Sequence, residues 1–286
     1  MTKDKKFQSS NTINAKGILL DLSTTQVMGI LNITFDSFYD GGKNNTLTKA
    51  VEKAHQFIKE GAKIIDIGAY SSRPGAKHIS ATEEWNRLKT IIPIINKEFP
   101  ETVLSVDTFR SEIARKSIDS GAHMINDISA GEMDEKMFDT ISELKIPYIL
   151  MHMKGKPQNM QNNPQYECIE DEIVDFFKKK ISILEKKGVE DIIVDPGFGF
   201  GKTLAHNYRL LNKMEKLNEL SRPLLAGVSR KSMIYKLLET QPQEALNGTS
   251  VLHTICLLKG VSFLRVHDVK EAVECIKIVN FAKNNS

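Results

Sequence analysis

The chain has 286 residues, which is enough for one large domain or two small ones. Hydrophobic residues make up 41% of it, an ordinary share for a globular protein with a buried core. The net charge of +3, from 39 basic and 36 acidic residues, is too balanced for a nucleic-acid-binding surface, so no nucleic-acid partner is expected. This charge is compatible with an anionic small substrate.

Neither a membrane segment nor a signal peptide is expected. No apolar run approaches the roughly 20 residues that a membrane span needs, and the basic amino terminus is not followed by an apolar segment before Ile18. The three cysteines are widely separated and form no C-x-x-C pair: Cys168, Cys256 and Cys275. They predict reduced thiols in a cytoplasmic protein rather than a disulfide framework or a zinc site.

A recurring unit organises the chain: a helical pattern, a glycine, and then a short apolar run. The glycines stand at Gly61, Gly121, Gly188 and Gly260. Glycine just past a helix supplies the left-handed conformation that releases the chain into a strand. The apolar runs are continuous rather than alternating, which is typical of strands buried on both faces of a parallel sheet.

Apolar residues at helical spacing predict the helices between these runs. Ser80 followed by Glu83 is a capping-box pattern and predicts a helix start. The three clearest stripes are Leu47, Ala50, Val51, Ala54, Phe57 and Ile58; Leu204, Tyr208, Leu211, Met214 and Leu217; and Val269, Ala272, Val273, Ile276 and Val279.

Eight strands are predicted, each followed by a helical pattern. They lie near residues 26–31, 63–67, 102–106, 123–127, 147–151, 191–195, 224–228 and 262–266. Eight such units favour a closed α/β barrel, the (β/α)8 TIM barrel, over an open sheet. We expect one domain over residues 25–286, with residues 1–24 as an extension that covers the barrel floor.

Polar residues follow almost every predicted strand. In a (β/α)8 barrel the active site lies at the carboxyl ends of the strands. One polar residue there is most often a helix cap, and Asp66 and Asp127 fit such a structural role. Seven of eight strand ends carrying an acid, amide or base instead favour one shared site, which should expect a ligand with several donors. These residues are Asn32, Ser72, Arg73, Asp107, Asn126, Asp195, Ser229, Lys231, Arg265 and His267.

The glycine-rich segment 197–203 is not a nucleotide-binding P-loop, because Pro196 stands where that motif needs glycine. It is better interpreted as a turn whose backbone can approach a ligand closely. Lys202 is expected either to face solvent or to support the site from behind.

The ordered segments resemble the dihydropteroate synthases of the folate pathway over almost the whole chain. Each segment alone is weak, but eight in the same order are specific. They are residues 28–42 (MGILNITFDSFYDGG), 71–76 (SSRPGA), 105–108 (SVDT), 125–127 (IND), 151–153 (MHM), 195–202 (DPGFGFGK), 227–231 (GVSRK) and 265–267 (RVH).

The resemblance implies a transferase that condenses 6-hydroxymethyl-7,8-dihydropterin pyrophosphate with para-aminobenzoate to give 7,8-dihydropteroate and pyrophosphate. It implies Asp107, Lys231 and Arg265 as catalytic residues. It also implies that the pterin is held by Asp107, Asn126, Asp195 and Lys231, since a carboxylate accepts the paired N–H donors of a pterin edge.

For the other substrate groups the resemblance implies a second set of contacts. Asn32, Arg73, Arg265 and His267 would bind the pyrophosphate, with Asn32 beside a Mg2+ ion, the expected cofactor. Ser229 and the helix start after it would meet the aminobenzoate carboxylate, beside Ser72, Pro74, Phe38 and Phe200. The family relationship further implies a homodimer through the last helices, and sensitivity to sulfonamides.

Three positions depart from the usual family pattern. Phe35 stands in place of proline, Ala69–Tyr70 in place of Gly–Glu, and Ser72 in place of threonine. These changes bear on loop geometry, aminobenzoate affinity and sulfonamide sensitivity, and leave the pterin site intact.

Two other functions would share part of this pattern. A methyltransferase that passes a methyl group from methyltetrahydrofolate to a corrinoid protein would share the pterin residues, but it has no use for a diphosphate site with Arg73 and His267. A non-catalytic pterin-binding homologue is a different class, since a fold alone does not fix function; the retained phosphate ligands argue against it.

Overall fold

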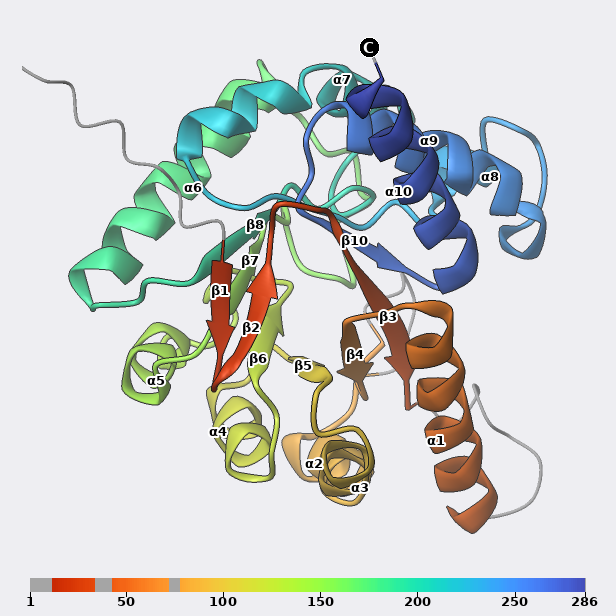
Figure 1. Ribbon diagram of the computed structural model, residues 1–286. Helices are drawn as coiled ribbons and strands as arrows, with labels where there is room; N and C mark the ends of the chain where they lie inside the picture. The colour runs from red at the N-terminus through yellow and green to blue at the C-terminus, as the bar shows by residue number, and fades with distance from the viewer. Residues whose placement is uncertain (1–11, 34–42, 72–77, 286) are drawn as a thin grey trace, which may run out of the picture.

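The chain forms a parallel eight-stranded barrel, as the computed structural model shows for residues 12–33, 43–71 and 78–285 (Figure 1). Within these residues every predicted strand is present, so the predicted (β/α)8 barrel is confirmed. The strands are β3 (Gln26–Asn32), β4 (Ile64–Gly68), β5 (Val103–Asp107), β6 (Met124–Asp127), β7 (Tyr148–Met151), β8 (Ile192–Asp195), β9 (Leu225–Ala226) and β10 (Phe263–Val266).

The barrel closes unevenly. β3 pairs with both β4 and β10, and pairing continues from β4 through β8 on one side and from β10 to β9 on the other. β8 and β9 meet only at an isolated parallel bridge between Val194 and Leu224. There the Val194 N–H donates to the Pro223 carbonyl at 3.0 Å.

Helices surround the strands in Figure 1. The α-helices are α1 (Lys43–Glu60), α2 (Ala81–Leu88), α3 (Ile91–Glu98), α4 (Ser111–Asp119), α5 (Met137–Leu144), α6 (Ile169–Lys186), α7 (Leu204–Asn212), α8 (Ser232–Tyr235), α9 (Leu246–Leu258) and α10 (Val269–Asn284). Two 3-10 helices, η2 (Met214–Leu220) and η3 (Pro242–Glu244), complete the set.

The predicted apolar stripes pack against the core except at Leu204, which is 38% exposed, and one of them changes helix type. The stripe that begins at Leu204 does not form one helix, because α7 ends at Asn212 and η2 carries the remaining buried positions. Only one of the two hydrogen bonds of the predicted capping box forms. Ser80 does cap α2 by accepting the Glu83 N–H at 3.1 Å, but the Glu83 carboxylate pairs with Arg87 instead of returning to the cap.

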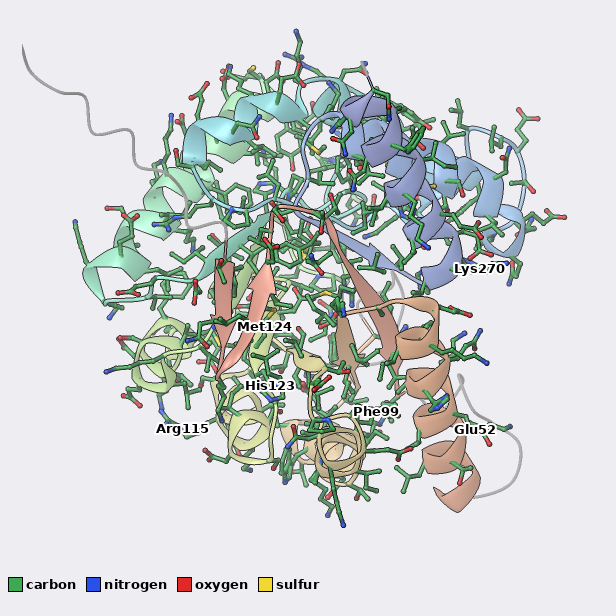
Figure 2. All side chains as sticks on the ribbon, viewed as in Figure 1. Glu52, Phe99, Arg115, His123, Met124 and Lys270 are labelled. Atoms are coloured by element: carbon green, nitrogen blue, oxygen red, sulfur yellow. The ribbon has the colours of Figure 1, made fainter. Side chains whose placement is uncertain are left out.

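An antiparallel hairpin lies at the amino end of the barrel. It consists of β1 (Thr12–Ala15) and β2 (Ile18–Asp21). Its buried Ile13 and Leu20 share one apolar cluster with residues from the strand starts, such as Met124, labelled in Figure 2. This end is therefore filled with apolar side chains. The domain boundary near residue 25 stays a prediction.

Among the described residues no helix is long and apolar enough to cross a membrane. Cys168, Cys256 and Cys275 are all free thiols.

Candidate active site

Four polar side chains from four strands form one hydrogen-bonded group inside the barrel. Asp66 on β4 is fully buried, and its Oδ2 accepts from Arg265 Nε at 2.6 Å and from Asn126 Nδ2 at 3.0 Å. Arg265 also donates from Nη2 to Asp107 Oδ2 at 2.8 Å. Thus the predicted Asp107, Asn126 and Arg265 do come together, and Asp66 joins them.

Asn32 lies beside this group. The Cβ of a side chain at Gly68 would be 3.4 Å from Asn32 Oδ1 and 3.8 Å from Asp107 Oδ2. A Cβ at the glycine that ends β4 would thus be in ordinary van der Waals contact with both oxygens, so Asn32 and Asp107 flank the same backbone position.

A second group surrounds Asp195, at the end of β8. The Asp195 Oδ1 accepts the Gly197 N–H at 2.7 Å, which fixes the carboxylate. Lys231 places its Nζ 4.1 Å from the centre of the Phe200 ring, a cation–π distance. The predicted Asp195, Phe200 and Lys231 therefore line one part of the site.

The charged side chains of the two groups lie close enough to shift one another's pKa. Burial lowers the pKa of Lys231 to about 8, and this effect outweighs the attraction of Asp195. Burial likewise raises the pKa of Asp107 to about 7, against the opposing effect of Arg265. Burial also raises the pKa of Asp195. Carboxylates and cations are thus held close together and poorly hydrated, which favours a ligand that replaces water as the hydrogen-bonding partner.

Ser229 and His267 are joined across the ends of β9 and β10. Ser229 Oγ is 3.0 Å from His267 Nδ1, and the His267 N–H donates to Ser229 Oγ at 3.2 Å. The neighbouring residues repeat the link, since Arg230 forms a two-pronged ion pair with Asp268 at 2.6 and 2.8 Å. Arg230 has a φ of +53°, in the left-handed region that non-glycine residues rarely adopt.

A buried lysine, Lys202, holds the glycine-rich turn of residues 197–201 in place. Lys202 is only 3% exposed, and its ammonium group donates to the carbonyls of Gly197 at 2.9 Å and Phe200 at 3.0 Å. His152 Nδ1 lies 3.0 Å from the same group. Burial lowers the pKa of Lys202 to about 7. Lys202 therefore does not face solvent; it supports the turn that carries Phe200.

Gly197 is needed for this arrangement. It has a φ of +67°, and a Cβ there would be 2.0 Å from the His152 carbonyl oxygen. Only glycine fits so close to the end of β7.

Two buried acids have different roles. Asp127 is satisfied locally, by Tyr148, Ser129 and Gly131, which agrees with the structural role expected of it. Asp66 is different, because it orients two site residues. An acid inside the apolar run Ile64–Ile67 was the signal that could have placed it in the site. Ser72 and Arg73 lie outside the described residues, as do Phe35, Phe38 and Pro74, so their roles stay predictions.

Comparisons with known proteins agree with this arrangement. Residues 28–267 match the family described as pterin binding enzyme. The dihydropteroate synthase of Escherichia coli K12 is 44% identical over 267 residues, covering 93% of this chain and 94% of the relative. That of Synechocystis is 41% identical over 259 residues, covering 90% and 89%.

Solved structures agree as well. The Yersinia pestis dihydropteroate synthase, in a sulfonamide drug complex, superposes with a TM-score of 0.90 at 40% identity, covering 96% of this chain and 100% of that one. The Xanthomonas albilineans enzyme with 4-aminobenzoic acid gives a TM-score of 0.89 at 36% identity, covering 95% and 98%. The chain therefore belongs to the pterin-binding enzyme family and, within it, to the dihydropteroate synthases.

Proposed function

We propose that the chain condenses 6-hydroxymethyl-7,8-dihydropterin pyrophosphate with para-aminobenzoate, giving 7,8-dihydropteroate and pyrophosphate. The observation that carries the proposal is the buried network in which Arg265 joins Asp66 and Asp107 beside Asn126. It supplies acceptors for a flat heterocycle and a cation for a leaving anion at one place.

The pterin would lie between Asp107, Asn126, Asp195 and Lys231. The free oxygen of Asp195 can accept the paired N–H groups of the pterin edge, because Gly197 already orients the carboxylate. Lys231 would donate to the pterin oxygen or to a ring nitrogen.

The diphosphate would meet Arg265 and His267, together with Arg73, and a Mg2+ ion. Among the described residues no group of three or more His, Cys, Asp or Glu side chains is arranged to hold a metal. The donor chemistry nevertheless fits a magnesium ion, because Asn32 Oδ1 and Asp107 Oδ2 lie near the same Gly68 position, and magnesium takes few protein oxygens and completes its shell with phosphate and water. When bound, the ion would neutralise charge on the leaving pyrophosphate.

Catalysis would begin with departure of the pyrophosphate. The bond between the pterin methylene carbon and oxygen breaks, and Arg265 stabilises the negative charge that leaves. The carboxylate of Asp107 stabilises the cationic methylene that remains. The neutral amine of aminobenzoate then forms the new carbon–nitrogen bond, and the acidic ammonium that results gives its proton to water or to the released pyrophosphate, so no strong general base is required.

Aminobenzoate would bind at Ser229, Ser72 and Phe200. Ser229 Oγ is held in place by two contacts with His267, and its hydroxyl would donate to the aminobenzoate carboxylate. The ring would lie beside Phe200. The bound 4-aminobenzoic acid of the Xanthomonas albilineans structure supports this class of second substrate.

The rate is expected to depend on pH through Lys231 and Asp107. The value of kcat/KM for the pterin substrate reports groups of the free enzyme. It should fall below about pH 7, where Asp107 gains a proton, and above about pH 8, where Lys231 loses one. In Lys231→Arg the guanidinium stays protonated, so the alkaline decline should move to higher pH although the maximum is lower. An alkaline decline that stays in place would assign it to another group.

We propose that two copies associate through α9 and α10, which lie side by side (Figure 1). Four large apolar side chains on these helices are between 53% and 73% exposed: Val251, Leu258, Ile278 and Phe281. Ile278 and Phe281 are three residues apart and share one helix face. Such exposure is typical of an interface.

Phe281→Asp should therefore give a monomer by analytical ultracentrifugation, because the charge cannot be buried against a second copy. Leu237→Asp is the matched control, since Leu237 is 54% exposed but lies outside α9 and α10. A protein that is monomeric before any substitution would contradict this interface. We also place the reaction in the cytoplasm, where three free thiols stay reduced.

The decisive experiment mixes purified protein, Mg2+, the pterin pyrophosphate and aminobenzoate. Release of pyrophosphate together with dihydropteroate supports the proposal. Methyl transfer from methyltetrahydrofolate to a corrinoid protein would replace it by the methyltransferase, and pterin binding without product would indicate a non-catalytic homologue.

A further inference from the structure

The loop between β7 and α6 contacts both sides of the site. Two of its glutamines, three residues apart, reach in different directions. Gln158 Nε2 donates to the hydroxyl of Tyr70 at 3.1 Å, and Gln161 Nε2 donates to the carbonyl of Gly199 at 2.6 Å. Tyr70 follows β4 and Gly199 belongs to the glycine-rich turn after β8, so residues 158–161 connect two loops that are far apart in sequence.

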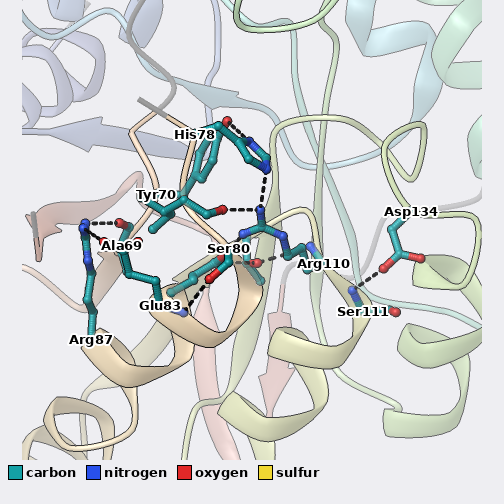
Figure 3. Close-up of polar contacts among 12 residues, drawn as sticks. Ala69, Tyr70, His78, Ser80, Glu83, Arg87, Arg110, Ser111 and Asp134 are labelled. Carbon is teal, nitrogen blue, oxygen red and sulfur yellow. Dashed lines mark hydrogen bonds and ion pairs between the residues drawn. The ribbon is translucent and has the colours of Figure 1, made fainter. Parts of the chain in front are cut away.

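Tyr70 is well fixed at its end of this connection (Figure 3). Its hydroxyl lies 3.2 Å from His78 Nδ1, and its ring meets Phe109 edge-on at 5.0 Å between centroids. Arg110 lies 5.5 Å from the centre of the same ring and donates to the Ile79 carbonyl at 2.7 Å. Arg110 is itself anchored by an ion pair with a buried acid, Glu84.

The other end is fixed on the turn that carries Phe200. The Gly199 N–H donates to Asn207 Oδ1 at 2.7 Å, so both backbone polar groups of Gly199 are engaged. Met160 lies between the two glutamines, and it belongs to one apolar cluster with Tyr70, against which Phe200 packs. Contacts of residues 158–161 therefore connect Tyr70 with the turn that carries Phe200, whose ring lies next to Lys231.

We propose that residues 158–161 form a positioning bridge that sets the separation between Tyr70 and Phe200, and thereby the fit of the aminobenzoate ring. This inference rests on the proposed function. The bridge touches neither Asp107 nor Asp195 in any contact described above and reaches Lys231 only through Phe200, so its effect on the second substrate should exceed its effect on the pterin. Tyr70 and both glutamines are positioning residues that act through Phe200.

Steady-state kinetics of Gln158→Ala, Gln161→Ala and Tyr70→Phe test the bridge. Each removes one or two neutral hydrogen bonds, so the KM for aminobenzoate should rise about three- to tenfold. The KM for the pterin substrate and kcat at saturation should change far less than the KM for aminobenzoate, and the thermal midpoint should fall by only the few degrees that the loss of one or two hydrogen bonds costs. Gln165→Ala is the matched control, because Gln165 lies in the same loop and its side chain donates to Asn163 Oδ1 within that loop, while its backbone carbonyl, which accepts from Lys154, is kept.

A double variant sharpens the test. Gln158 and Tyr70 share one hydrogen bond, so Gln158→Ala combined with Tyr70→Phe should be no worse than Tyr70→Phe alone. Equal rises in both KM values, purely additive effects, or a rise in the Gln165→Ala control would overturn the proposal.

Amide hydrogen exchange separates this inference from the proposed function. Gln161→Ala should speed exchange in residues 197–201, and Gln165→Ala should not. A wild-type protein that makes no dihydropteroate would refute the function, and the exchange rates would still decide whether the bridge holds the turn. Unchanged exchange in Gln161→Ala would refute the bridge in either case.

Discussion

Asp195→Ala is expected to abolish pterin binding and to leave the fold intact. The carboxylate is proposed to accept two N–H donors of the pterin, and each hydrogen bond to a charged group contributes about 1.5–3 kcal/mol. Losing both weakens binding by roughly 100-fold or more. Calorimetric titration with the pterin substrate measures the loss, and circular dichroism checks the fold.

A control for this variant lies on the approach to the same strand. Asp191 precedes β8, and its carboxylate accepts the Asn14 N–H of the hairpin at 3.3 Å. Asp191→Ala should therefore leave pterin affinity unchanged. Retained affinity in Asp195→Ala, or an equal loss in both variants, would discredit the proposed pterin site.

Asp66→Ala is expected to damage both stability and catalysis. It would leave the half-buried Arg265 without its partner at 2.6 Å and Asn126 without its acceptor at 3.0 Å. Removing one partner of a buried ion pair costs about 3–5 kcal/mol when the other charge is left unpaired, and because Arg265 keeps Asp107 the loss here should fall below that range. Urea unfolding should show this loss, and kcat/KM should fall because Arg265 and Asn126 are no longer held in place.

Two comparisons isolate the cause. Asp66→Asn keeps an acceptor of the same shape, so it should lose less stability than alanine and still lower kcat/KM. Asp119, exposed at the end of α4, provides a surface control in Asp119→Ala. An Asp66→Ala protein as active as wild type would show that Arg265 is oriented by Asp107 alone.

The positions of the strands could be read from local signals. Each glycine that ends a helix precedes a continuous apolar run, and both depend only on residues close together in sequence. The polar residues after these runs could be assigned to one site because a parallel barrel brings all carboxyl ends together.

The contacts of Asp66 could not be predicted in this way. Its partners Asn126 and Arg265 are 60 and 199 residues away, so nothing in the run Ile64–Ile67 indicates which groups face the carboxylate. The change of helix type after Asn212 was missed because apolar spacing is similar in the two helices. The loop that contains Gln158 has no periodic pattern, and its bridging contacts depend on how two other loops are placed.

The isolated bridge between β8 and β9 would give a pterin bound at the proposed site a second role. Asp195 ends β8 and Lys231 follows β9, so a ligand held by both would fasten the barrel at its most sparsely bonded seam. A ligand at 100 times its dissociation constant stabilises the folded state by about 2.7 kcal/mol. This stabilisation should be concentrated in β8 and β9. The substrate would then strengthen the closure of the barrel as well as react in it.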